Sequence, residues 1–167
     1  MNKTFYFIFL FIFLVLLQVF VLSNIHFLGY INPYLYISFI FFFPLNENRF
    51  PFLTYAFLLG LCVDFFLDSG GIHAFSTLFI GYIRLFYVKL FFKKSAIDFP
   101  FFTLELESFG KVFNFVVTLT LIHHFILFAF INFSFQNMLD VVLNTLFSSI
   151  FTLLLFFTGS YIFIKRG

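Results

Sequence analysis

The sequence has only one cysteine, Cys62, and few charged side chains. A single cysteine excludes a disulfide framework and a cysteine-based metal cluster within the chain. Only 10% of the 167 residues are charged, and a net charge of +2 provides no basic surface for nucleic acid. Apolar residues make up 63% of the chain, and its mean hydropathy is +1.12. Soluble domains are much less apolar, so the sequence predicts an all-α integral membrane protein with almost no extramembrane mass.

Phenylalanine is unusually frequent, with 37 copies in the chain. It is spread over every apolar segment without a fixed period. A coding bias toward A and T enriches phenylalanine without functional meaning, and we favour this interpretation over an aromatic cage for a ligand.

Six apolar segments predict a bundle of six transmembrane helices, because about 20 apolar residues cross a bilayer as a helix. The first segment is longer than the apolar core of a signal peptide and lacks a cleavage site, so we expect it in the mature protein. Segment 33–45 is short, so it is either a short or tilted span or a re-entrant one, and five spans are the alternative. The predicted single membrane domain, 1–167, has a cytoplasmic loop at 93–111 and spans at 4–22, 33–45, 51–67, 72–92, 112–131 and 141–164.

The basic residues indicate an orientation. With six spans, all nine lie in or toward loops on one side, which the positive-inside rule assigns to the cytoplasm. We therefore expect a multi-pass protein of the bacterial inner (plasma) membrane with both termini cytoplasmic. Three aspartates (Asp64, Asp68, Asp140) and four histidines (His26, His73, His123, His124) then fall toward the outer half. The nine basic residues are Lys3, Arg49, Arg84, Lys89, Lys93, Lys94, Lys111, Lys165 and Arg166.

The spans at 51–67 and 72–92 each carry small and charged residues along one face. Residues three or four positions apart share a face of a helix. Small residues allow transmembrane backbones to approach closely, so we expect the two faces to pack against each other. They consist of Ala56, Gly60, Asp64 and Asp68 on the first span and Ala74, Thr77, Gly81 and Arg84 on the second, and Ala56, Gly60, Asp64, Thr77, Gly81 and Arg84 are the residues expected at the contact.

Asp64 and Arg84 occupy depths where lipid makes a charge costly, so each needs a protein environment. Folding the hairpin about Gly70 places Asp64 level with Thr77 and Arg84 level with Phe57. The two charges are then about 10 Å apart along the helix axes. An ion pair between them requires both side chains to lean. The alternative is a structural Asp64 that is protonated, or hydrogen-bonded to Thr77 or to a histidine.

The other polar residues have structural interpretations. Asp68 is expected to end its helix, and a cation site shared with Asp64 is the alternative. His123 and His124 are adjacent and point about 100° apart on a helix, so they cannot bind one metal ion from one face. We expect them to form hydrogen bonds between helices. The sequence thus predicts no catalytic residue, no metal site and no cofactor.

Several short motifs follow one another along nearly the whole chain. They are Gly60-Leu61-x-x-Asp64, Gly71-x-His73-Ala74, Arg84, the run His123 to Phe128, Phe133-Ser134-Phe135, and the run Ser148 to Thr152. In this order and spacing they resemble the MreD family of rod shape-determining membrane proteins, in the version found in the Bacteroidetes group. Members of that family often have proline where this chain has Leu85, and an acidic residue where it has Ile131.

The resemblance implies a non-enzymatic membrane subunit of the cell-elongation machinery. MreD proteins are understood to scaffold MreC, a single-span protein with a periplasmic domain. Through MreC they act with the RodA glycosyltransferase and a class B penicillin-binding protein, and MreB filaments lie on the cytoplasmic side. Their fold is thought to be similar to the six-helix substrate-binding subunits of energy-coupling-factor vitamin transporters.

Two other classes of protein are alternatives. A substrate-binding subunit of a small-molecule transporter would line a ligand site with Asp64, Arg84, His123 and His124. A membrane aspartyl protease would need Asp64 and Asp140 to meet at one depth, and neither has a flanking catalytic motif.

Overall fold

The computed structural model describes residues 3–25, 31–45, 49–93, 104–132 and 138–164. All regular elements of these residues are helices, and five are long and apolar enough to cross a membrane. Polar backbone groups are satisfied within such helices, which is the requirement for crossing lipid. The five are α1 (Lys3–Phe20), α3 (Phe50–Leu67), α4 (Ile72–Phe92), α5 (Phe109–Asn132) and α6 (Met138–Ile164), and the short helices are η1 (Leu22–Asn24), η2 (Leu35–Ile37), α2 (Ser38–Phe42) and η4 (Leu104–Leu106).

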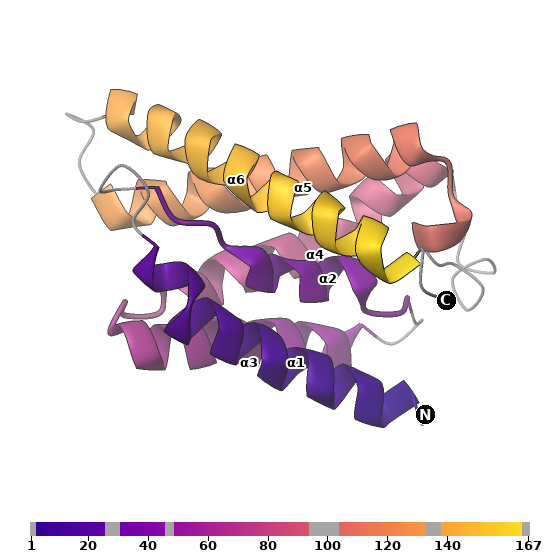
Figure 1. The fold of residues 1–167 in the computed structure, drawn as a ribbon, viewed down its shortest axis with the longest axis horizontal. Helices are drawn as coiled ribbons and strands as arrows, with labels where there is room; N and C mark the ends of the chain where they lie inside the picture. Colours follow the sequence, from indigo (N-terminus) through magenta and orange to yellow (C-terminus); the bar gives the residue numbers. More distant parts are fainter. Residues whose placement is uncertain (1–2, 26–30, 46–48, 94–103, 133–137, 165–167) are drawn as a thin grey trace.

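The second predicted span does not form one regular helix. Residues 33–45 contain η2, the five-residue α2, and extended backbone at Phe43. The chain nevertheless runs here from the end of the bundle where α1 finishes to the end where α3 begins (Figure 1). Extended residues advance about 3.3 Å each, against 1.5 Å in an α-helix, so a short irregular stretch covers this distance. Residues 31–45 are called the interior segment below.

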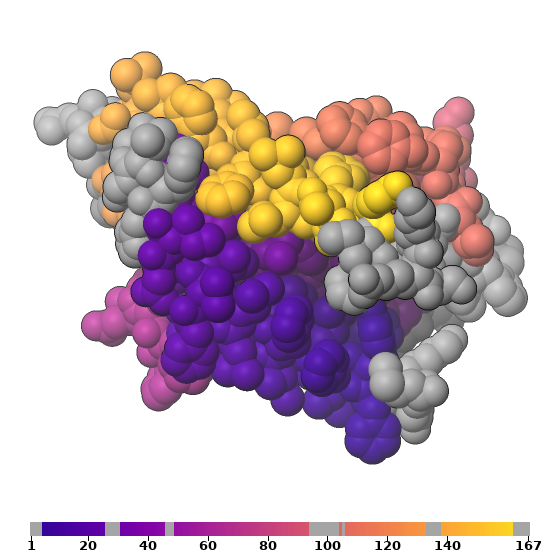
Figure 2. All heavy atoms as spheres, in the orientation of Figure 1, coloured from indigo at the N-terminus to yellow at the C-terminus, as the bar shows by residue number. Residues whose placement is uncertain are grey.

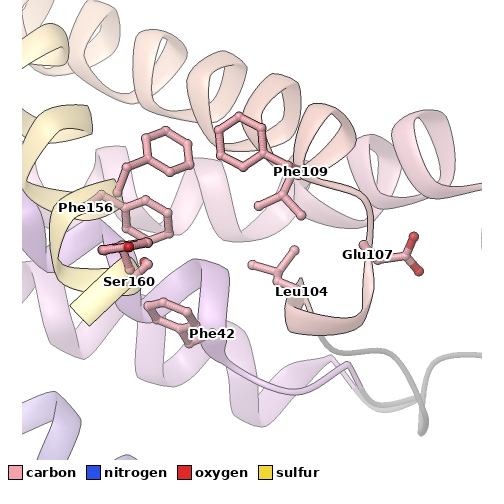
Figure 3. A pocket seen from close by; sticks show the side chains of 9 residues that line it. Phe42, Leu104, Glu107, Phe109, Phe156 and Ser160 are labelled. Carbon is pink, nitrogen blue, oxygen red and sulfur yellow. The ribbon is translucent and has the colours of Figure 1, made fainter. Parts of the chain in front are cut away.

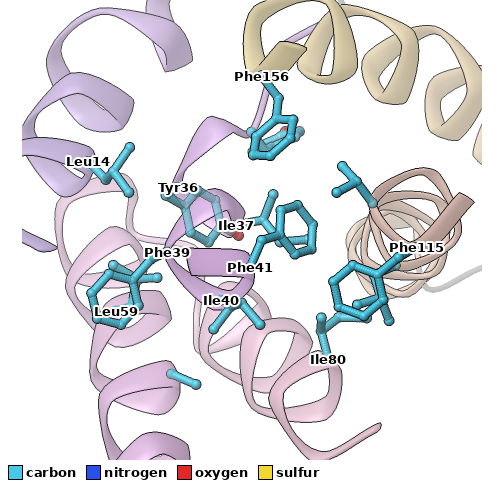
Figure 4. Packing of buried hydrophobic residues seen from close by; sticks show 14 of the residues in the cluster. Leu14, Tyr36, Ile37, Phe39, Ile40, Phe41, Leu59, Ile80, Phe115 and Phe156 are labelled. Carbon is cyan, nitrogen blue, oxygen red and sulfur yellow. The ribbon is translucent and has the colours of Figure 1, made fainter. Parts of the chain in front are cut away.

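The interior segment lies at the centre of the core. Tyr36, Ile37 and Ile40 are completely buried. Figure 4 shows them among side chains from the surrounding long helices, including Leu14, Leu59, Ile80, Phe115 and Phe156. In the space-filling view, α1 and α6 form much of the visible surface and largely hide this segment (Figure 2). Irregular backbone is tolerated at membrane depth only where protein surrounds it in this way.

Helices α3 and α4 form the expected hairpin, with the two small-residue faces packed together. Added at Gly60, a Cβ atom would lie 2.5 Å from Ala74 Cα and closer still to His73 O and Thr77 Oγ1. At Gly81, a Cβ atom would lie 3.3 Å from Ala56 Cβ. Only glycine at position 60 therefore permits this approach of the two backbones.

The register of this hairpin differs from the prediction by one helical turn. Thr77 lies against Gly60 rather than level with Asp64, and Arg84 lies over Phe52 rather than level with Phe57. The turn itself lies where it was expected, because Asp68, with φ 52°, takes the left-handed conformation directly after Leu67, and α4 begins at Ile72. Helix α4 then starts beside the last turn of α3.

The two ends of the bundle differ in charge. Arg49 precedes α3, Lys93 follows α4 and Lys111 lies in the first turn of α5. These positions share the end where α1 begins and α6 finishes (Figure 1). Asp68, between α3 and α4, and Asp140, in the first turn of α6, lie at the opposite end.

Candidate functional site

Asp64 caps the N-terminus of α4. Its Oδ1 accepts hydrogen bonds from Ser69 Oγ at 2.5 Å and from the His73 backbone N–H at 3.0 Å. Its Oδ2 accepts one from the Ala74 backbone N–H at 2.7 Å. The first backbone N–H groups of a helix have no partner within the helix and carry partial positive charge, so a carboxylate is stabilised there. Asp64 thus accepts a hydrogen bond from the backbone of His73 rather than from its imidazole ring. It forms no hydrogen bond with Thr77, whose hydroxyl donates to His73 O.

Arg84 caps the C-terminal end of α2. Its Nη2 donates hydrogen bonds to Phe41 O, at 3.2 Å, and to Phe43 O. The guanidinium carbon lies 5.0 Å from the centre of the Phe52 ring. Carbonyl groups at the end of a helix lack partners and favour a cation. Asp64 and Arg84 therefore bind different helix ends, and the ion pair considered from the sequence does not form.

Tyr36 joins two histidines from different helices. Its hydroxyl lies 2.8 Å from His73 Nδ1 on α4 and 3.1 Å from His123 Nε2 on α5. A tyrosine hydroxyl donates one hydrogen bond, so one of these two ring nitrogens must itself donate. All three side chains are buried. They fix the interior segment against α4 and α5.

His124 makes a separate set of contacts on the next face of α5. Its Nδ1 lies 2.9 Å from Thr120 O, a carbonyl that only accepts, so this nitrogen is the donor. Its Nε2 lies 3.0 Å from Thr152 Oγ1 on α6. Both His123 and His124 thus form the interhelical hydrogen bonds expected of them. Within the described ranges, no group of three or more His, Cys, Asp or Glu residues is arranged to hold a metal ion.

Side chains of three long helices satisfy backbone groups of the interior segment. Gln18 on α1 donates to Pro33 O at 3.0 Å, and Arg84 on α4 binds the carbonyls at the end of α2. Thr152 on α6 accepts from the Tyr34 backbone N–H at 2.9 Å. These bonds replace those that a regular helix would make internally. We call Gln18, Tyr36, Asp64, His73, Arg84, His123, His124 and Thr152 the polar network.

Three of the eight members of the polar network, Gln18, Tyr36 and Thr152, were not predicted from the sequence as site residues. Gln18 had a signal, because it is the one polar residue in the apolar run of α1. Tyr36 and Thr152 had no such signal in the sequence. Tyr36 lies in an apolar run and Thr152 follows a pair of serines, and similar runs occur elsewhere in the chain. His73 was noted for its depth, while its partner Tyr36 became visible only in three dimensions.

The residues predicted for helix packing are all buried inside the chain. Ala56, Gly60, Asp64, Thr77, Gly81 and Arg84 lie in or beside the contact of α3 with α4. They are therefore occupied by the chain's own helices. Asp140 is exposed at the start of α6, and Asp68 is exposed at the end of α3. His26 lies outside the described residues.

These helices and their polar interior define the protein as an α-helical, multi-pass membrane protein. Comparisons of the chain with protein-family models, with curated proteins and with solved structures found no match.

Proposed function

We propose that this protein is an MreD-like, non-enzymatic subunit of a bacterial cell-elongation complex. In this function it scaffolds an MreC-like single-span protein, a RodA-type glycosyltransferase and a class B penicillin-binding protein, and so regulates cell shape and lateral wall synthesis. MreB filaments are a further candidate partner on the cytoplasmic side. The motifs from Gly60 to Thr152 are the basis for naming this family.

One structural observation favours a scaffold over an enzyme or a carrier: every member of the polar network hydrogen-bonds at least one of the chain's own groups, although Gln18 Oε1 and Arg84 Nε and Nη1 have no such bond among the described residues. Both oxygens of Asp64 accept bonds from the hairpin, and Arg84 caps α2. His123 and His124 bond Tyr36 and Thr152. What the chain presents outward is apolar helix surface, such as Phe65 of α3, which is 82% exposed. Such a surface faces lipid, and it leaves room for contact with other transmembrane helices, which close packing rather than hydrophobicity would stabilise.

The charge distribution supports an orientation with both termini in the cytoplasm. Arg49, Lys93 and Lys111 share one end of the bundle with the start of α1 and the end of α6. Basic residues are retained on the cytoplasmic side during membrane insertion. Five long helices, with the interior segment as the proposed sixth passage, are also compatible with the proposed likeness to energy-coupling-factor substrate-binding subunits.

Co-purification from native membranes in mild detergent tests the proposal. Mass spectrometry is expected to identify a single-span protein with a large periplasmic domain together with a penicillin-binding protein, and depletion of the chain is expected to turn rods into spheres. Unchanged cell shape together with the absence of both partners would refute the scaffold function. Recovery of a tightly bound small molecule with an ATPase module would instead support the transporter subunit.

A further inference from the structure

A pocket of about 420 Å³ lies outside the polar network. It is formed where α2 ends, α5 begins and α6 approaches its end (Figure 3). Its apolar walls consist of Phe42, Leu104, Phe109, Val112, Phe156 and Phe157.

The walls of the pocket are held in place by ring contacts. Phe42 stacks on Phe156 with ring centres 5.5 Å apart, and Phe109 lies 5.8 Å from Phe157. Such contacts between aromatic rings stabilise a fixed arrangement. The pocket is therefore preformed, and its volume is in the range of small-molecule sites.

The charged residue of the pocket lies at its edge. The Glu107 carboxylate points away from the rings in Figure 3 and pairs with Lys111 at 4.0 Å. Ser160 and Tyr161 complete the lining from the last turns of α6. Tyrosine near the end of a transmembrane helix is typical of the membrane–water interface. An apolar cavity with a polar edge at this depth matches a molecule with an apolar tail and a polar head.

The exposed lysines at this end of the bundle favour an anionic head group, although the one charged residue that lines the pocket, Glu107, is acidic. Lys89, Lys93 and Lys111 are exposed at the adjoining ends of α4 and α5. Lysines near a membrane surface attract anionic lipids. Water gains little from an apolar cavity, whereas an acyl chain fills it favourably. We propose that this pocket binds an acyl chain of an anionic phospholipid whose phosphate lies beside Lys111.

Photo-crosslinking of the full chain in vesicles tests the site. The vesicles are made of phosphatidylcholine and contain a trace of one of two probe lipids. Each probe carries a diazirine at the end of one acyl chain, and its head group is either phosphatidylglycerol or phosphatidylcholine. The phosphatidylglycerol probe is expected to label the peptides that contain the pocket walls. Val112→Phe should reduce this labelling about tenfold, because the added ring occupies the space of the chain. Val142→Phe, on an exposed position of α6, is the matched control and should leave the labelling unchanged.

The contribution of charge is tested separately on the unmodified pocket. Lys111→Gln should reduce the preference for phosphatidylglycerol over phosphatidylcholine about fivefold, since one lysine near the surface contributes about this factor. Labelling spread evenly over lipid-facing positions such as Leu146 would overturn the site. So would a crosslink from the pocket to a second copy of the chain or to another protein. Equal labelling of the wild-type pocket by both lipids would overturn its specificity for an anionic head group.

Discussion

At the scale of single residues, the two intramembrane charges stabilise helix ends rather than each other. Asp64 binds free N–H groups at the start of α4, and Arg84 binds free carbonyl groups at the end of α2. The end of a helix carries partial charge, so each side chain is partly compensated without a counter-ion. The compensation is complete for Asp64, whose two oxygens both accept hydrogen bonds, whereas Nε and Nη1 of Arg84 have no hydrogen-bond partner among the described residues.

Replacing Asp64 tests this capping role. Asp64→Asn removes the negative charge and turns an amide NH₂ toward backbone N–H donors. We expect the free energy of unfolding in detergent to fall by about 1–3 kcal/mol, because buried donors lose their acceptor. The measurement is a denaturant titration followed by circular dichroism.

Asp68→Asn is the matched control for that experiment. The Asp68 side chain is exposed, and its backbone has a left-handed conformation that asparagine adopts readily. The free energy of unfolding should therefore change by less than about 0.5 kcal/mol. Equal losses for the two variants would show that the contacts of Asp64 contribute nothing specific.

At the scale of elements, close approach of α3 and α4 depends on the glycine at position 60. The backbone of His73 and Ala74 occupies the space that a side chain there would need. The same approach brings Asp64 within reach of the first N–H groups of α4. Helix packing and helix capping therefore support one another in this hairpin.

A pair of glycine variants separates packing from helix propensity. Gly60→Ala is expected to cost about 1–3 kcal/mol of stability, because its Cβ meets backbone atoms that cannot move aside. Gly159→Ala, in α6, meets no atom within 4 Å and should stabilise the helix by about 0.5–1 kcal/mol. Both are measured by thermal unfolding in the same detergent. A neutral Gly60→Ala would contradict the observed helix contact.

At the scale of the whole molecule, charge distinguishes the two ends of the bundle. The described lysines and arginines that are exposed, including Arg49, Lys93 and Lys111, lie at one end, and Asp68 and Asp140 lie at the other. Five helices are long enough to cross a membrane, and the proposed sixth passage is the interior segment, which is not a membrane-length helix. With six passages the chain would return to its starting side, as the proposed orientation requires.

Cysteine labelling measures this topology in cells. In a Cys62→Ser background, Arg49→Cys and Lys111→Cys should react with a membrane-impermeant maleimide only after the cytoplasmic side is opened. Asp140→Cys and Met138→Cys, at the start of α6, should react in cells whose outer membrane is permeabilised and whose inner membrane is intact. Labelling of Lys111→Cys and Asp140→Cys from the same side would exclude the arrangement of Figure 1.

The sequence by itself determined the class of the protein and its long helices. The predicted spans 51–67 and 72–92 agree with α3 and α4 to within one residue, and the last two spans begin three residues later than α5 and α6. These features follow from local composition, because a run of apolar residues is recognisable without knowledge of its neighbours. The pairing of the small-residue faces was predictable for the same reason, since it repeats along each helix.

Only the tertiary structure decided the register of the hairpin, the irregular interior segment and the partners of its polar groups. Thr152 and the backbone of Tyr34 are 118 residues apart in sequence, and Arg84 and Phe41 are 43 apart. Such contacts depend on how all the helices pack around one segment, which no local pattern encodes. Because the bilayer core has no water to bind a polar backbone group, such a group must form its hydrogen bond with a side chain that lies next to it in the packed structure.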